Sequence, residues 1–175
     1  KINGIHDRLR VMLISGEPNM GLRSWRNLLN SDPAIELIHF TILRPPNKRD
    51  LTPVRELSLI PFPSRELFAA NLDEFDLIIF DQYSLRGILP PKYLNNIVNY
   101  VYNGGALLDA SGPSYASQFS LSNSPLKSIL PTIPTGKIVN EPFTPLISSS
   151  GTKHPVTSEL NEYLSTNSWG DWYRY

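Results

Sequence analysis

Four short stretches of the chain are almost wholly apolar, and each has about the length of a buried β-strand. They are residues 9–15, 35–43, 75–80 and 106–110. Apolar runs of roughly four to eight residues between turn formers are typical of strands that are covered on both faces, as in a parallel sheet. We therefore expect these stretches, with 106–110 as a central strand, to form the middle of the fold.

Two stretches between these strands repeat their apolar residues at helical spacing. The first predicts a helix over 21–31, and the second predicts a helix over 93–102. Their apolar faces are Leu22, Trp25, Leu28 and Leu29 in the first helix, and Tyr93, Leu94, Ile97, Val98 and Val101 in the second. Pro91 can open the second helix because the first turn needs no N–H donor, and Gly104 can end it.

The remaining segments are less regular. A polar, proline-rich stretch at 44–50 predicts a loop, and 57–63 is ambiguous, with a short edge strand as one interpretation. The other weak predictions are a short capped helix at 64–68, a helical turn at 125–130, short strands at 137–139 and 145–147, and a short segment at 158–164. The order strand, helix, strand, strand, helix, strand predicts an α/β fold with a doubly wound parallel sheet.

Composition and charge argue against several classes of function. The chain has 175 residues, of which 41% are hydrophobic, so it can bury a core as one domain. Its formal net charge is zero, which gives no reason to expect a nucleic-acid partner. The absence of cysteine excludes a thiol nucleophile, a disulfide framework and a thiolate metal site. No apolar run is long enough for a transmembrane helix. The chain starts at Lys1 without Met and ends in an aromatic stretch, so we expect both ends to be cuts within a longer protein, with 1–7 as a leader or linker.

Polar residues follow three of the predicted strands. They are Glu17 and Asn19, then Asp81, Gln82 and Tyr83, then Ser111, Gly112 and Ser114. Because the carboxyl ends of parallel strands meet at one edge of a sheet, where ligands bind in such folds, we expect these residues to line a cleft together with Arg23. The alternative is that they only cap helices and form turns, as these residue types do in most loops.

A catalytic interpretation makes Ser111 a nucleophile and His154 its base, oriented by Glu17 or Asp81. The motif Gly-x-Ser-x-Gly is absent around Ser111. His39 lies within a predicted strand, which favours a packed side chain, and His154 precedes a proline, which favours a structural hydrogen bond. No metal-ligand spacing and no glycine-rich phosphate loop is found, so we expect neither a metal nor another cofactor.

Arg23 follows the loop that contains Glu17. Its side chain either reaches Glu17 or Asp81, or points to solvent while Glu17 caps the helix. In both cases we expect Glu17 to have a local structural role, which argues against its use as a catalytic base.

Six motifs together resemble a known family. They are RVMLISGEP at 10–18, HFTILRPP at 39–46, ELSLI at 56–60, FDLIIFD at 75–81, GGALL at 104–108 and HPVT at 154–157. As a set they look like the uncharacterised glutamine amidotransferase-like domain of bacterial integral membrane proteins, within the class I glutamine amidotransferase-like superfamily. The resemblance extends over 8–174.

The resemblance implies a flavodoxin-like three-layer α/β/α sandwich over 8–175 that continues past Tyr175, so that the sheet here is truncated at its C-terminal side. It implies membrane segments outside this sequence and a location at the bacterial inner membrane. The domain itself would be soluble and on the periplasmic side, with the cytoplasmic side as the alternative. Other segments of the same membrane protein would then be its partners.

The resemblance also bears on activity. Class I amidotransferases carry a Cys-x-Gly elbow, and matching its glycine to Gly112 places Ala110 at the nucleophile position. A methyl group cannot attack an amide, so we expect a pseudoenzyme without glutaminase activity that binds a small ligand or a protein partner. A hydrolase that uses Ser111 with His154 remains the alternative.

Overall fold

The computed structural model describes residues 8–16, 19–41, 65–87, 89–160 and 171–173. Within these residues the chain divides into two compact units, 1–135 and 136–175, and each is described by itself below. The predictions for 44–50 and 57–63 lie outside the described residues, as do Ser64 and Glu17.

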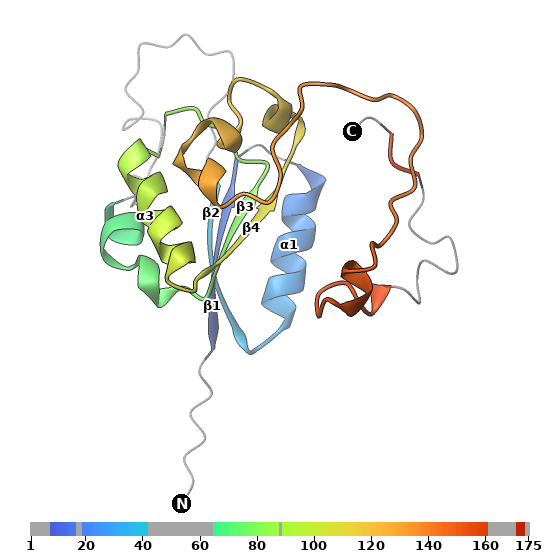
Figure 1. Ribbon diagram of the computed structural model, residues 1–175. Helices are drawn as coiled ribbons and strands as arrows, with labels where there is room; N and C mark the ends of the chain where they lie inside the picture. The colour runs from blue at the N-terminus through green and yellow to red at the C-terminus, as the bar shows by residue number, and fades with distance from the viewer. Residues whose placement is uncertain (1–7, 17–18, 42–64, 88, 161–170, 174–175) are drawn as a thin grey trace, which may run out of the picture. The chain divides into compact units, whose positions relative to one another are not determined.

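The first unit is built on a four-stranded sheet in the order β2-β1-β3-β4, in which all neighbouring strands are parallel (Figure 1). The strands are β1 (Leu9–Ser15), β2 (Ile35–Thr41), β3 (Leu77–Asp81) and β4 (Ala106–Ala110). Ser15 is paired in register with Thr41 on one side and with Asp81 on the other, and Asp81 is paired with Ala110. The fold is therefore mixed α/β, and the carboxyl ends of all four strands meet at one edge, as the sequence predicts.

Helix α1 (Met20–Ser31) covers one face of the sheet and helix α3 (Pro91–Tyr102) covers the other (Figure 1). Alternate residues of each strand point to opposite faces, which divides the core into two clusters. Under α1 lie Val11, Leu13, Leu29 and Ile79, and under α3 lie Met12, Ile14, Ile78, Phe80, Leu94 and Ile97 among others. Both predicted helices are confirmed.

Two details of the helix predictions need correction. Leu28 was expected on the buried face of α1, but its side chain is 63% exposed. At about 100° per residue, Leu28 lies roughly 120° around the helix from Leu22, which does pack on the core. In α3, Ile97 is fully buried, whereas Val98 is only half-buried at the side of the contact.

Strand β4 differs from the expected central strand covered on both faces. Its only neighbour among the described residues is β3, so it forms an edge of the sheet. Leu107 and Leu108, one on each face, are half-buried rather than buried. An apolar run predicts a strand from its own composition, but its degree of burial depends on the neighbours that cover it.

Short turns complete the two units. Residues 66–70 form one turn of π-helix where a short capped helix was expected. The helical turn predicted at 125–130 is confirmed as a 3₁₀ turn over Pro125–Ser128, and Leu126 is buried beneath it. The strands predicted at 137–139 and 145–147 are wrong, because those residues have no ladder partner in the described part of the second unit. The pairing found there is a single antiparallel bridge between Phe143 and Trp172.

None of the helices in the described residues combines the length and the apolar character that a membrane span requires.

Candidate binding site at the strand ends

The strand order places the topological switch point of the sheet between β1 and β3. From β1 the chain passes to β2 on one side, and it later returns to β3 on the other side. In open parallel sheets, ligands bind in the crevice that this reversal leaves at the carboxyl ends of the strands. Ser15 ends β1 and Asp81 ends β3, so both residues lie at this point.

Asp81 is the centre of a buried polar cluster at the switch point. Its side chain is 3% exposed, and its Oδ2 accepts a hydrogen bond from Asn19 Nδ2 at 2.9 Å and a long contact from Ser15 Oγ at 3.5 Å. Asn19 also caps α1, because its Oδ1 accepts a hydrogen bond from the Leu22 N–H at 2.9 Å. The carboxylate thus lies near the amino end of α1, where the helix dipole favours negative charge. This is where α/β folds commonly hold a phosphate, so the protein's own Asp81 disfavours a phosphate there.

His39 joins this cluster from β2. Its Nε2 lies 3.2 Å from Thr41 Oγ1 and 3.5 Å from Ser15 Oγ. Partial burial and the positive charge of Arg26 lower the pKa of His39 below 6.5, and the Asp81 carboxylate opposes them. His39 is therefore less readily protonated than a histidine in the unfolded chain. His39 is half-buried within β2, in line with the packed side chain that was expected. Its polar contacts with Ser15 and Thr41 were not predicted.

Gln82 has the one positive φ angle of a non-glycine residue in the described chain, at 46°. Such a conformation costs free energy and persists only where the surroundings fix it. Here the Gln82 N–H donates to the Ala110 carbonyl and the Gly16 N–H donates to the Asp81 carbonyl, each at 2.9 Å. A Cβ on Gly16 would lie 2.6 Å from the Tyr83 Cα, so only glycine allows this approach. Backbone contacts therefore hold the ends of β1, β3 and β4 together.

One residue predicted for the cleft, Tyr83, lies in the core instead. Tyr83 is buried in the core on the α3 side, with its ring 4.9 Å from that of Phe80. Burial raises the pKa of Tyr83 to about 12, against a smaller opposing effect of the Leu89 backbone. Ser114 is half-buried in a 3₁₀ turn, and Gly112 lies against the side chain of Gln82.

Ser111 is exposed just after β4, and its hydroxyl donates a hydrogen bond to Asp109 Oδ2 at 2.7 Å. Burial raises the pKa of Asp109, and the hydrogen bond from Ser111 partly offsets this. Asp109 is thus the acceptor for this hydroxyl, and sequence reasoning did not predict this pair. His154 belongs to the second unit, where its Nδ1 accepts a hydrogen bond from the Val156 N–H at 3.2 Å. The pairing of Ser111 with His154 stays a prediction.

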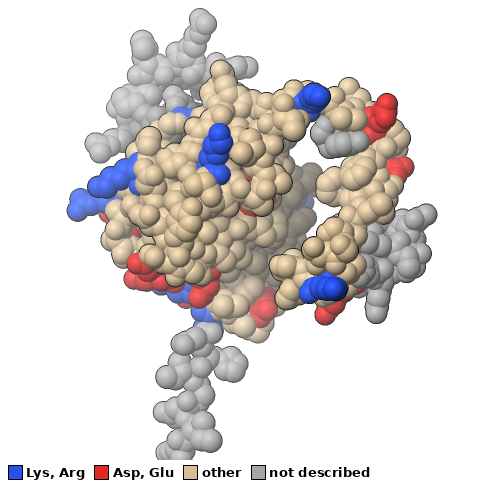
Figure 2. Space-filling model, viewed as in Figure 1, with Lys and Arg blue, Asp and Glu red and all other residues tan. Residues whose placement is uncertain are grey.

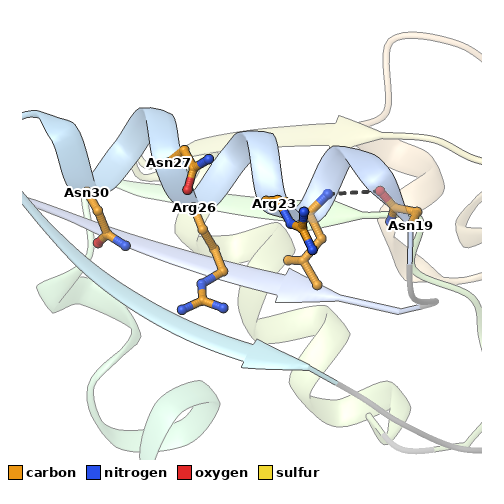
Figure 3. Close-up of a pocket in the computed structure, with 6 residues that line it drawn as sticks. Asn19, Arg23, Arg26, Asn27 and Asn30 are labelled. Atoms are coloured by element: carbon orange, nitrogen blue, oxygen red, sulfur yellow. Dashed lines mark hydrogen bonds between the residues drawn. The ribbon is translucent and has the colours of Figure 1, made fainter.

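A groove of about 450 Å³ runs along α1 from the cluster. It is lined by Asn19, Leu22, Arg23, Arg26, Asn27 and Asn30. Figure 3 shows Arg26 and Asn30 directed from the helix toward the strands, with Arg23 one turn before Arg26. Asn19 rather than Arg23 holds Asp81. Arg23 is exposed, which agrees with the expected alternative in which it points to solvent. Glu17 lies outside the described residues, so the expected contact between Arg23 and Glu17 stays a prediction.

The described residues give no support for a metal site. They contain no group of three or more His, Asp or Glu side chains placed to hold a metal ion. On the face seen in Figure 2, Lys and Arg stand singly between large uncharged areas.

Comparison of the chain with protein-family models, with curated proteins and with solved structures gives no match.

Proposed function

We propose that this chain is an amidotransferase-like domain without glutaminase activity, which binds a ligand or a partner at the carboxyl ends of its strands. The observation that carries the proposal is the elbow after β4. Its nucleophile position holds Ala110, and the sequence has no cysteine that could replace it. The only hydroxyl beside this position in the chain, that of Ser111, is engaged with Asp109.

The fold assignment belongs to the same proposal. A flavodoxin-like three-layer α/β/α sandwich has strand order 2-1-3-4-5 with helices on both faces. The order β2-β1-β3-β4, with α1 on one face and α3 on the other, is what this fold requires of its first four strands. The half-buried edge of β4 is compatible with a further strand beside it.

A binding role is supported by the arrangement at the switch point. Asn19 precedes α1, whereas Asp81 ends β3 and Gln82 follows it, and hydrogen bonds and a strained backbone hold these residues in place. Side chains fixed in this way bind a ligand at a small cost in conformational entropy. From the family resemblance we further propose that the domain belongs to a bacterial inner-membrane protein, on the periplasmic or else the cytoplasmic side, with segments of that protein as partners.

The second candidate is a hydrolase that uses Ser111 with His154. Its support is the position of Ser111, which is exposed and follows the carboxyl end of a strand. Its weakness is the acceptor of the Ser111 hydroxyl, because Asp109 is a carboxylate with a raised pKa and not an imidazole.

One set of assays separates the two functions. Ammonia release from glutamine and hydrolysis of p-nitrophenyl acetate are measured for the full chain, for Ser111→Ala and His154→Gln, and for the exposed control Ser128→Ala. We expect no glutamine turnover in any sample, and the same background ester hydrolysis in all four. Glutamine or ester turnover that Ser111→Ala abolishes and Ser128→Ala leaves intact would contradict the non-catalytic proposal.

A further inference from the structure

We propose that the groove along α1 binds a small organic anion through Arg23 and Arg26, with a phosphate or carboxylate group of the ligand between the two guanidinium groups. The inference rests on the proposed binding function and adds the chemical class of the ligand.

The two arginines are suited to share one anionic group. They are three residues apart in α1, which places their Cβ atoms about 5–6 Å from each other on one side of the helix. Both are exposed and both line the groove. A guanidinium presents several N–H donors in a planar fork that matches the oxygens of carboxylate and phosphate, and such charge-assisted bonds are the strong ones.

Neither arginine is neutralised by the protein within the described residues. The ion pairs found there are those of Arg10 with Glu36 and Glu74, on another part of the sheet. Asp81, the carboxylate that accepts a hydrogen bond from the groove residue Asn19, is buried. The described lining of the groove thus carries two positive charges and no negative charge.

The rest of the lining suits a ligand that also carries hydroxyl groups. Asn27 and Asn30 place amide groups beside the arginines, and an amide both donates and accepts hydrogen bonds. A volume of about 450 Å³ is in the range of small-molecule sites, roughly 300–1,000 Å³. An anionic sugar derivative has both features.

The simpler alternative is that α1 only exposes a solvated polar side. The position of Arg26 argues against it, because its charge acts on His39 of β2 and lowers the pKa of that residue. Arg26 is exposed, but its side chain is directed from α1 toward the strands, as Figure 3 shows. Such a position places a cation in the groove, within reach of a ligand bound there.

The test is a ¹⁵N NMR titration of the full chain with glucose 6-phosphate, gluconate and inorganic phosphate, each at constant ionic strength. The first two probes separate a phosphate from a carboxylate ligand, and the third measures the contribution of the hydroxyl groups. We expect saturable shifts at residues 19–30 and at His39 with at least one of the organic probes, together with shifts of the Arg23 and Arg26 Nε–H signals.

The charge of the groove is tested with a pair of matched variants. Arg23→Gln with Arg26→Gln should weaken binding about tenfold or more, as expected for the loss of charge-assisted hydrogen bonds. Arg65→Gln with Lys92→Gln removes two exposed positive charges elsewhere and should leave the affinity unchanged. The dispersion of the backbone spectrum verifies that both variants are folded.

Either of two results would overturn the anion groove. One is the absence of saturable shifts along α1 with all three probes, and the other is equal affinity in the two double variants. Both results leave the lack of glutaminase activity standing, because that part of the proposed function is judged by the ammonia assay. Ser111-dependent glutamine turnover would instead refute the proposed function while the titration still reports on the groove.

Discussion

His39 is surrounded by ionisable and polar groups from four elements. It faces Ser15 from β1, Thr41 from its own strand, Asp81 from β3 and Arg26 from α1. Burial is the largest influence and lowers its pKa, Arg26 acts in the same direction, and Asp81 opposes them. The folded protein therefore takes up a proton at His39 less readily than the unfolded chain does.

This difference predicts a dependence of stability on pH. Where the unfolded state binds more protons, the free energy of unfolding falls as the pH is lowered, here through the unfolded histidine pKa of about 6.5. Urea unfolding between about pH 7.5 and 5.5, where most carboxylates stay ionised, should show this fall in the native chain and a smaller one in His39→Gln. The comparison uses slopes, since the substitution also changes contacts with Ser15 and Thr41.

His154→Gln is the matched control, because His154 is exposed in the second unit. It should keep the slope of the native chain. If His39→Gln and His154→Gln change the slope equally, the half-buried environment of His39 is not what lowers its pKa.

The same cluster shows how far the sequence could predict the site. Asn19 and Asp81 were included because they follow strands, and the structure brings them together. Ser15 and His39 were missed because they belong to strands, whereas the candidates for the site were taken from the loops that follow the strands. Residues 15, 39 and 81 all point to the α1 face, and the register of the strands brings them side by side. The sequence of a single strand does not determine its register with its neighbours, so this contact could not be predicted.

At the scale of elements, α3 is the helix whose packing the sequence predicted best. Of its predicted apolar face, Leu94 and Ile97 are buried. Tyr100, which was not predicted for that face, is buried as well. Tyr100 also donates a hydrogen bond to the Phe75 carbonyl at 3.0 Å, which ties the helix to the start of β3. The edge position of β4 could not be predicted in the same way, because it depends on which other strands are present.

Ile97→Ala tests the packing of α3. The side chain is fully buried between the helix and the sheet, so its truncation leaves a cavity and should destabilise the protein by about 2–5 kcal/mol. Urea unfolding at pH 7 measures the change. Asn95→Ala, at an exposed position of the same helix, is the control and should change the stability by less than about 0.5 kcal/mol. An unchanged stability in Ile97→Ala would mean that α3 does not cover the sheet.

At the scale of the whole molecule, the buried residues are unevenly divided between the two units. Every buried side chain in the described residues belongs to the first unit, and Leu126 is the last of them in the sequence. The described residues after Gly136 are exposed or half-buried, and they include the exposed apolar side chains Leu146, Val156 and Trp172. The stability of the first unit should therefore depend little on the second, although the family resemblance treats 8–175 as one domain.

A fragment of residues 1–135 should fold on its own, because it contains the whole described core. We expect a single cooperative thermal transition within about 5 °C of that of the full chain, and backbone NMR signals of the core strands that overlay on those of the full chain. A fragment of residues 1–120 is the control, since it lacks Leu121 and Leu126, which are almost fully buried. Loss of two such leucines costs about 2–5 kcal/mol each, which is comparable to the total stability of a domain, so this fragment should not fold. If 1–135 is also unfolded, the second unit supplies contacts that the core requires, and the resemblance to a single domain over 8–175 gains support.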